Sequence, residues 1–376
     1  MSLLWPIVRK TLFGPRRTAA VDDRRTYTRL DILGGAMFMA REIEKATDAP
    51  HIGIMLPTSG AFPIAPPGAW LARRVAVPLN YLLSPEELEY VIRDSEVDTI
   101  ITAQMMLDFL KGADDQSDNA ADRPRAVPDA INLLHMDKLR FKGLPPLRLP
   151  PRYGRDDLAV LLYTSGTSGK PKGVMLTHGN LRSDIDASID HAGIRSADTF
   201  LGVLPQFHSF GLTALTLLPL RVGASTVYSA RFIPRKIIGL IKEHRPDIVM
   251  AVPSMYGALL SVKNAEPDDF ACIRYAISGG EPLPDAVFEA FKERFDVRIL
   301  EGYGLTETSP ITHWSTPARY KRHGVGPALP NCTVAVVDDN NNILGPNEEG
   351  EILLAGPMIM KGYYKLEDLT AEVMVE

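Results

Sequence analysis

Residues 163–173 constrain the fold of this chain more than any other segment, because they place a glycine-rich polar loop directly after an apolar run. The run Leu158-Ala-Val-Leu-Leu-Tyr163 is continuously apolar, which is typical of a buried strand in a parallel sheet. Hydroxyl residues, glycines and lysines follow it, in the order Thr164-Ser-Gly-Thr-Ser-Gly-Lys-Pro-Lys-Gly173. Glycine lets successive N–H groups converge on one point, and such a nest binds anions. The loop therefore predicts a polyphosphate site, and a mobile surface turn is the alternative interpretation.

The loop is not a Walker P-loop. That motif needs a glycine, four residues and then Gly-Lys-Ser/Thr. Here Gly166 and Gly169 are three residues apart, and Pro171 follows Lys170. The side chains that could hold phosphate oxygens are four hydroxyls and two ammonium groups, from Thr164, Ser165, Thr167, Ser168, Lys170 and Lys172.

The string YTSGTSGKPKGV, residues 163–174, resembles the phosphate-binding signature of the adenylate-forming superfamily, which includes acyl-CoA synthetases, luciferases and peptide-synthetase adenylation domains. The family's motif reads TSGTTGxPKGV, so the one departure is Ser168, which keeps the hydroxyl. The resemblance implies that a carboxylate reacts with ATP to give acyl-AMP and pyrophosphate. A thioester with CoA or acyl carrier protein then forms. It assigns ATP binding to Thr164, Ser165, Gly166, Thr167, Ser168, Gly169 and Lys172, and makes Lys172 catalytic as well.

A second motif, Leu300-Glu-Gly-Tyr-Gly-Leu-Thr-Glu-Thr308, resembles the family pattern YGxTE. By this resemblance Tyr303 would stack on adenine, and Thr306 would hydrogen-bond the α-phosphate. Glu307 would bind Mg²⁺ through oxygen, so Thr306 and Glu307 are candidate catalytic residues. Glu301 and Gly302 would belong to the ATP site. The alternative is a capped helix start whose polar residues lie on the surface.

Two weaker segments occur in the order that the family shows, Leu204-Pro-Gln-Phe-His-Ser-Phe-Gly211 and Ser278-Gly-Gly-Glu-Pro-Leu283. In the first, His208 would lie beside the carboxyl group being activated. The resemblance assigns the acyl pocket to Phe207, His208, Gly279 and Gly304, makes His208 catalytic, and adds Gly280, Glu281 and Pro282 to the ATP site. The alternatives are a structural histidine and an ordinary turn between a strand and a helix.

Three features indicate the class of acid. Amino-acid-activating relatives carry Asp at the position of His208, so an amino acid is disfavoured. Acetate-activating relatives carry a bulky Trp at the position of Gly304, so glycine leaves room for a longer chain. The run Phe207-His-Ser-Phe-Gly-Leu212 together with Met360-Lys-Gly-Tyr-Tyr364 resembles bacterial long-chain fatty acyl-CoA or acyl-ACP synthetases. We therefore expect a medium- or long-chain fatty acid, with an aryl acid such as a cinnamate as the alternative.

Short apolar runs alternate with amphipathic stretches along most of the chain, which predicts an α/β fold. We expect two parallel-rich sheets flanked by helices, and a small antiparallel β-barrel subdomain after about residue 310. The predicted units are residues 1–195 with the phosphate loop, residues 196–310 and residues 311–376. Lys111–Arg155 is polar and then Pro-rich, which predicts an exposed linker between the two sheets. Pro66 and Pro67 predict a kink or a late helix start where relatives have a helix.

Family members continue past the point where this sequence stops. They carry a Thr-Gly-Asp motif whose Asp holds the ribose, then a hinge and a mobile C-terminal lid with a lysine. We expect the chain to be part of a longer protein. The alternative is a naturally lidless nucleotide- or acyl-binding module with weak catalysis.

Composition excludes several other classes of protein. The net charge of −5 argues against nucleic acid as a partner, and the two cysteines, Cys272 and Cys332, form neither a disulfide framework nor a metal cluster. The sequence contains no run of eighteen apolar residues, so it predicts no transmembrane helix. We therefore expect a cytoplasmic enzyme. The apolar start, Met1-Ser-Leu-Leu-Trp-Pro-Ile-Val8, could make a peripheral membrane contact or pack on its own protein.

Overall fold

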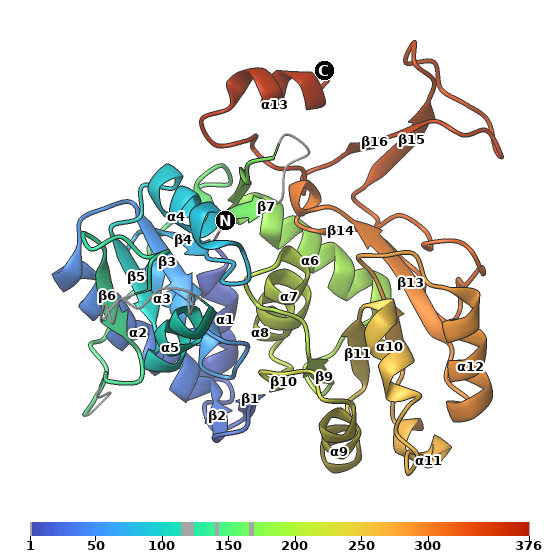
Figure 1. The fold of residues 1–376 in the computed structure, drawn as a ribbon, viewed down its shortest axis with the longest axis horizontal. Helices are drawn as coiled ribbons and strands as arrows, with labels where there is room; N and C mark the ends of the chain where they lie inside the picture. The colour runs from blue at the N-terminus through green and yellow to red at the C-terminus, as the bar shows by residue number, and fades with distance from the viewer. Residues whose placement is uncertain (1, 114–123, 140–142, 165–168, 376) are drawn as a thin grey trace.

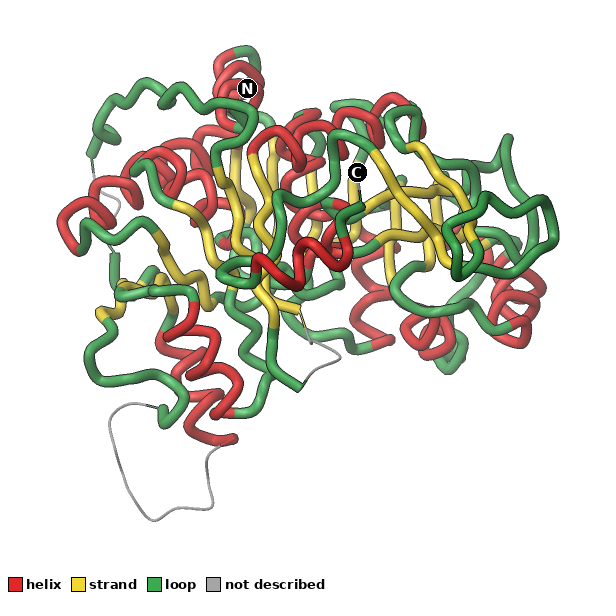
Figure 2. Tube along the Cα trace, turned by 90° about the horizontal axis from the view of Figure 1, so that it is seen from above, coloured by secondary structure: helices red, strands yellow, loops and turns green. Residues whose placement is uncertain are grey.

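The structure is a computed structural model that describes residues 2–113, 124–139, 143–164 and 169–375. Two large sheets stand side by side, and helices cover their faces (Figures 1 and 2). Each sheet together with its helices is called a lobe below. This arrangement confirms the predicted α/β class with two parallel-rich sheets.

The first sheet has six strands in the order β6-β5-β3-β4-β7-β8, and every neighbouring pair is parallel except β7 with β8. Helices α2 and α3 pack on one face, and α4 and α5 pack on the other, in two separate hydrophobic clusters. The elements are β3 (His51–Met55), β4 (Val75–Pro78), β5 (Thr99–Thr102), β6 (Asn132–His135), β7 (Leu158–Thr164), β8 (Lys172–Thr177), α2 (Arg29–Ala46), α3 (Ala65–Leu71), α4 (Pro85–Asp94) and α5 (Gln104–Ala113).

The second sheet has eight strands in the order β14-β13-β12-β11-β9-β10-β1-β2, and only the pair at each edge is antiparallel. The outer face is covered by α9 (Pro234–His244), α10 (Pro253–Leu259), α11 (Pro267–Phe270) and α12 (Asp285–Phe295), which share one cluster. The strands are β1 (Thr18–Val21), β2 (Thr26–Thr28), β9 (Thr199–Gly202), β10 (Ser225–Tyr228), β11 (Ile248–Ala251), β12 (Tyr275–Ser278), β13 (Ile299–Gly304) and β14 (Ile311–Trp314).

Sheet membership does not follow chain order at the N-terminus. Strand β1 pairs in parallel with β10, so residues 18–28 lie in the second sheet, on the far side of the predicted boundary at residue 195. The first helix, α1 (Leu4–Leu12), packs its buried Leu4 and Ile7 against the central core. None of the described helices is long and apolar enough to cross a membrane.

The central core lies between the two sheets, where apolar residues from both join one cluster. This layer holds α6 (His178–Ala192), then α7 (Ser209–Leu212), the π-helical turn η2 (Thr213–Leu217) and α8 (Leu218–Val222). Helix α6 begins with a capping box, in which Thr177 Oγ1 accepts from Asn180 N at 3.0 Å and Asn180 Oδ1 accepts from Thr177 N.

Near the C-terminus the pattern changes to β15 (Thr333–Val337) and β16 (Glu351–Ala355), which form a two-stranded antiparallel sheet. Helix α13 (Glu367–Val373) follows, and Figure 1 shows both parts above the two lobes. The antiparallel subdomain is therefore present, but the described residues close no barrel. The region between the lobes and this subdomain also contains η3 (Thr306–Thr308).

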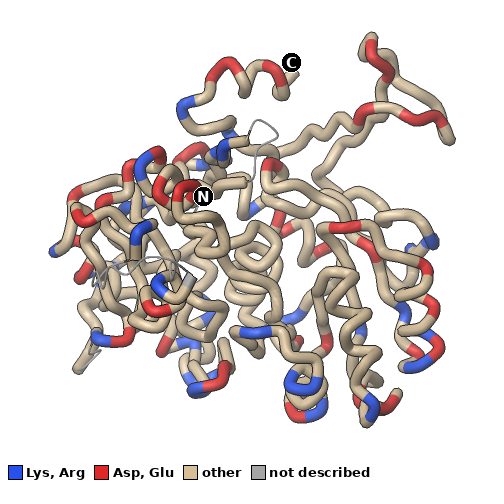
Figure 3. Tube along the Cα trace, viewed as in Figure 1, with Lys and Arg blue, Asp and Glu red and all other residues tan. Residues whose placement is uncertain are grey.

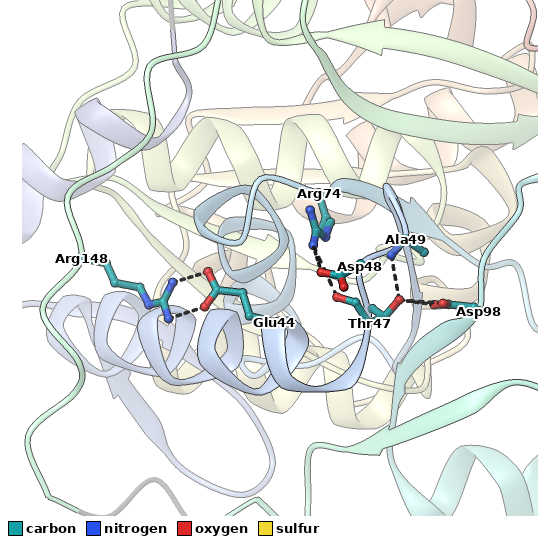
Figure 4. Close-up of polar contacts among 7 residues, drawn as sticks. All are labelled: Glu44, Thr47, Asp48, Ala49, Arg74, Asp98 and Arg148. Carbon is teal, nitrogen blue, oxygen red and sulfur yellow. Dashed lines mark hydrogen bonds and ion pairs between the residues drawn. The ribbon is translucent and has the colours of Figure 1, made fainter.

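Two local predictions can be compared with the structure. Pro66 and Pro67 lie in the first turn of α3, which begins at Ala65 after the 3₁₀ turn η1 (Phe62–Ile64), so the late helix start is confirmed. The linker prediction for residues 111–155 is wrong in part, because this segment contributes β6 to the first sheet and is followed by β7 and β8 of the same sheet. Arg148, within it, forms a two-pronged ion pair with Glu44 on α2 (Figure 4).

Candidate active site

A first cavity has a volume of about 410 Å³ and opens where β7, β12 and β13 end. In open parallel sheets, ligands bind beyond the carboxyl ends of the strands, because the loops there converge and leave backbone groups free. The segment before α7 closes one wall, and β14 closes another. The cavity therefore lies between the two lobes, and both sheets contribute to it.

Nine of the residues predicted from sequence motifs line this one cavity. They come from four separate segments of the chain: Thr164; His208; Gly279 and Gly280; and Gly302, Tyr303, Gly304, Thr306 and Glu307. The fold therefore brings together the phosphate-loop strand, the aromatic–histidine segment, the glycine turn and the YGxTE segment. Ser165, Gly166, Thr167 and Ser168 lie outside the described residues.

Thr306 and Glu307 occupy η3, directly after β13. The Thr306 hydroxyl donates to Ser209 Oγ at 3.1 Å, and both side chains are almost fully buried. Glu307 Oε1 accepts a hydrogen bond of 2.8 Å from the Tyr363 hydroxyl. Burial, and secondly this bond to a carboxylate, raise the pKa of the Tyr363 hydroxyl, so it remains a proton donor. These contacts fix the side chains that face the cavity.

Lys172 is the first residue of β8 and directly follows Pro171, which lines the cavity. Its Nζ is 5.6 Å from the centre of the Tyr363 ring, a cation–π contact. Tyr363 therefore contacts both the predicted phosphate-binding lysine and the predicted metal-binding carboxylate. Lys170 turns elsewhere, with Nζ 5.4 Å from the Tyr90 ring. Gly169 has a φ of +88°, which supports the predicted need for glycine in the loop.

His208 caps α7, and its Nδ1 accepts from the Phe210 backbone N–H at 3.4 Å. Because Nδ1 accepts, the neutral ring carries its proton on Nε2. The side chain opens into the cavity, but enclosure by protein lowers the pKa of the imidazole below its usual value, since desolvation disfavours the charged form. Near neutral pH, His208 is therefore a neutral hydrogen-bond donor.

Gly304 has a backbone reason to be glycine. A Cβ at this position would lie 1.6 Å from the Pro310 carbonyl oxygen, where β13 and β14 shift register between Tyr303 and Gly304. No side chain can be placed there without moving the loop. The glycine therefore says less about acyl-chain length than its comparison with a Trp suggested.

Six described residues of the predicted site do not line the cavity, namely Gly169, Lys172, Phe207, Glu281, Pro282 and Glu301. Glu281 and Pro282 are exposed. Glu301 forms an ion pair of 2.8 Å with Arg322. Phe207 is buried against Tyr81, with ring centres 4.8 Å apart, and Phe210 lines the cavity instead. The roles of these six residues, and of the nine that line the cavity, remain predictions.

Sequence reasoning missed several residues that shape the site, namely Ser209, Phe210, His313, Trp314 and Tyr363. Ser209 and Phe210 lie inside the segment Leu204–Gly211, so the sequence already indicated that they lie near the site. Tyr363 belongs to the run Met360-Lys-Gly-Tyr-Tyr364, which indicated a class of acid and no role for either tyrosine. Nothing in that run shows which of the two tyrosines faces Glu307.

The sequence model of the AMP-binding enzyme family matches residues 11–364. The chain is 29% identical to a long-chain-fatty-acid–CoA ligase of Bacillus subtilis, over 96% of this chain and 70% of the relative. It is 28% identical to the Haemophilus influenzae ligase of the same name, and covers 63% of it. A feruloyl-CoA synthase of Amycolatopsis is also 28% identical, over 98% of this chain and 73% of the relative. The chain thus spans about two thirds of the length of these relatives.

Solved structures share the fold. The N-terminal domain of FACL13 from Mycobacterium tuberculosis superposes with a TM-score of 0.85 at 24% identity, covering 100% of this chain and 94% of that one. Apo MatB from Rhodopseudomonas palustris gives a TM-score of 0.85 at 24% identity, covering 100% of this chain and 74% of the other.

Proposed function

Because this chain belongs to the AMP-binding enzyme family, we propose that it activates a carboxylic acid with ATP and passes the acyl group to a thiol. In the first step, a carboxylate oxygen bonds to the α-phosphorus, and the bond to the bridging oxygen of the β-phosphate breaks. The products are acyl-AMP and pyrophosphate. In the second step, the thiol sulfur bonds to the acyl carbon, and AMP leaves.

One observation carries this proposal: a single cavity is lined by Thr164, His208, Tyr303, Thr306 and Glu307. Carboxylate and triphosphate are both anionic, so the reaction needs positioning and charge compensation more than acid–base chemistry. Lys172, which follows the cavity-lining Pro171, and the N–H groups of the glycine turn would supply positive charge and donors. Tyr303 offers a flat ring to adenine.

His208 and Thr306 have distinct proposed roles. The neutral His208 ring would donate a hydrogen bond to the bound carboxylate and orient it. Because the ring is not a cation, it would form no ion pair that reduces the nucleophilicity of the attacking oxygen. The Thr306 hydroxyl donates to Ser209 Oγ in the free protein, and it would turn this single proton to an oxygen of the α-phosphate when the nucleotide binds. Neither residue needs to exchange a proton with bulk water during adenylation.

The residues at the site fit a magnesium ion carried by the nucleotide. Among the described residues no cluster of three or more His, Cys, Asp or Glu side chains could hold a metal alone. Mg²⁺ typically takes one or two carboxylates together with substrate phosphates, so Glu307 is a sufficient protein ligand. When bound, the ion would offset the phosphate charge. Tyr363 would hold the Glu307 carboxylate in place for it.

We propose a medium- or long-chain fatty acid as the substrate, and an aryl acid as the second candidate. The apolar part of the cavity wall, which includes Met250, Ile277 and Trp314, would accept either. The run from Phe207 to Leu212 supports the fatty acid. The similar identity to a feruloyl-CoA synthase supports the aryl acid.

The test is ATP–pyrophosphate exchange by the full-length protein with a panel of acids, namely octanoate, dodecanoate, palmitate, cinnamate, ferulate and phenylalanine. Exchange with the saturated acids is expected. Exchange restricted to cinnamate or ferulate would move the assignment to the aryl class. Exchange with phenylalanine alone, or with no acid, would contradict the proposal.

CoA and acyl carrier protein remain the two proposed acceptors. Thioester formation measured with each, at equal acyl-AMP supply, separates them. The cytoplasm remains our proposed compartment.

We also propose a peripheral membrane contact at the end of α1. Leu12 and Phe13 are highly exposed there. Lys10 has a lowered pKa, first because of burial and then because Arg29, Arg9 and other cations surround it. Exposed apolar groups beside cations favour anionic lipid surfaces. Cosedimentation with phosphatidylglycerol vesicles but not with phosphatidylcholine vesicles is expected, and should be weakened by Phe13→Ser. Equal recovery with both lipids would argue against the contact.

A further inference from the structure

A second cavity, with a volume of about 450 Å³, lies between the first sheet and the β1–β2 turn of the second sheet, and none of its lining residues also lines the first cavity. Its floor comes from the segments that follow three parallel strands of the first sheet. These are Leu56–Ser59 after β3, Ala103 and Met105 after β5, and Met136–Leu139 after β6. The turn between β1 and β2 covers it.

The topology of the first sheet explains why a cavity forms there. From β3 the chain crosses to β4 on one side, through α3, whereas from β5 it crosses to β6 on the other side, through α5. Because β3 and β5 are neighbours, the loop after β3 and the loop after β5 start side by side and run to opposite faces of the sheet. They leave a crevice between the two helix layers. Such switch points are where open α/β sheets bind ligands. A cavity of several hundred Å³ is also of the size that small-molecule sites have.

The acidic groups at the mouth of this cavity already have partners. Asp22 accepts from the backbone N–H groups of Arg24, Arg25 and Gly60. Asp23 pairs with Lys236 at 2.6 Å, and Asp137 accepts from the backbone of Gln104. These carboxylates are therefore held by the protein itself.

The two arginine side chains at the mouth have no such partner. Among the described residues, neither the Arg24 nor the Arg25 guanidinium forms an ion pair. Arg24 Nη2 contacts the Met105 sulfur at 3.3 Å, and Arg25 lies over the Tyr27 ring at 4.2 Å. A thioether is a weak acceptor, so the Arg24 donors remain available to a stronger one. Beside the carboxylates, the two guanidinium groups are thus the charged groups of this cavity that form no ion pair within the described part of the chain and keep donors for a ligand.

The walls below the arginines are apolar. They include Leu56, Ile64, Met105, Met136 and Leu139. Methionine side chains adapt to ligands of different shape, because they are unbranched and polarisable. A ligand that matches the whole site has an apolar body and one anionic end.

We propose that this cavity is a second binding site, which takes an amphipathic monocarboxylate with its carboxylate on Arg24 and its apolar part against Met105 and Met136. The site is separate from the reaction cavity and does not depend on the function proposed above. Arg24 would form a charge-assisted hydrogen bond, the strong kind for a carboxylate.

The test is titration of the full-length protein with decanoate by isothermal calorimetry, with the reaction cavity first saturated by a non-hydrolysable acyl-AMP analogue. One equivalent of decanoate is expected to bind under these conditions. Arg24→Gln should weaken that binding by about tenfold or more, since a hydrogen bond between charged groups is lost. Arg152→Gln, at an exposed arginine outside both cavities, is the matched control and should leave the affinity unchanged.

Met105→Trp adds a second test, because the larger side chain should fill the cavity and abolish the remaining equivalent. The surface variant Arg24→Gln keeps the proposal testable even if Met105→Trp does not fold. Loss of all decanoate binding when the analogue is present would overturn the proposal. So would equal affinities of Arg24→Gln and Arg152→Gln. If the analogue itself does not bind but one equivalent of decanoate still responds to Arg24→Gln, the function proposed for the first cavity fails and the second site stands.

Discussion

The Tyr363 hydroxyl donates a hydrogen bond of 2.8 Å to Oε1 of Glu307, and so joins the segment after β16 to the YGxTE loop at the cavity. The backbone makes the same connection, since Met360 N donates to the Glu307 carbonyl at 2.7 Å. The position of the proposed magnesium ligand therefore depends on residues more than fifty positions further along the chain.

Tyr363→Phe removes this hydrogen bond and keeps the ring. We expect adenylation to fall about 10- to 100-fold at limiting Mg²⁺, because a hydrogen bond to a charged group is lost and the carboxylate is no longer held. The measurement is pyrophosphate release as a function of Mg²⁺ concentration. Tyr364→Phe is the control, because its hydroxyl donates to Glu96 away from the cavity. Equal activities of the two variants would remove Tyr363 from the site.

Glu307→Gln keeps the size of the side chain and removes its charge. We expect adenylation to be largely abolished while thermal unfolding stays close to that of the parent protein, since the group acts as an oxygen ligand rather than as core packing. Glu293→Gln, at an exposed position on α12, controls for loss of a surface charge. Normal Mg²⁺-dependent turnover by Glu307→Gln would refute the assignment.

Gly304→Ala should destabilise the protein by about 2–4 kcal/mol and reduce activity, because the new Cβ meets the Pro310 carbonyl at 1.6 Å and the β13–β14 connection must move. Gly239→Ala is the matched control. It lies in α9 with nothing within 4 Å of the new Cβ, so a small gain of about 0.5–1 kcal/mol is expected. Urea unfolding measures both. A neutral Gly304→Ala would show that the loop is free to shift.

His178 makes stability depend on pH. It is buried against Trp70 and Tyr153, neither ring nitrogen has a hydrogen-bond partner among the described residues, and desolvation lowers its pKa to about 3. Between about pH 6.5 and pH 3, His178 is therefore protonated in the unfolded chain and neutral in the folded chain. The contribution of neutral His178 is complete above pH 6.5 and is lost as the pH falls, at about 1.4 kcal/mol per pH unit.

The measurement is the free energy of unfolding of His178→Phe and of the parent between pH 7 and pH 4.5. The free energy of unfolding of the variant should fall less steeply on acidification than that of the parent. The difference in slope should correspond to at most one proton. His323→Asn is the control, because His323 is exposed and Asn tolerates its positive φ. Parallel pH curves for His178→Phe and the parent would show that the acid sensitivity arises elsewhere in the protein.

Local sequence patterns predicted the regular elements well where they depend on neighbours alone. The strands Ser225–Tyr228, Ile248–Ala251 and Tyr275–Ser278 are each a short apolar run that ends at a turn, so the sequence near each strand is enough to indicate it. The four residues Ser84-Pro-Glu-Glu87 form a capping box with proline at the first helical position, which marks the start of α4 in the same way. Such signals lie within a few residues and need no tertiary information.

The relationships between distant segments could not be predicted in this way. The pairing of β1 with β10 joins residues about two hundred positions apart, and no local pattern encodes it. Family motifs named Tyr303, Thr306 and Glu307, but not the contact of Thr306 with Ser209 or of Glu307 with Tyr363. Figure 3 shows charges of both signs on the outer helices, and this mixed pattern does not indicate where the site lies either.

The most direct test of the central claim is to follow the carboxylate oxygen through the reaction. The full-length protein is incubated with ATP, Mg²⁺, CoA and dodecanoate labelled with ¹⁸O in its carboxylate, and the products are analysed by mass spectrometry. Attack of the carboxylate on the α-phosphorus places one ¹⁸O in AMP and none in pyrophosphate, which is the result that our account predicts. Label in inorganic phosphate, or AMP without label, would contradict it.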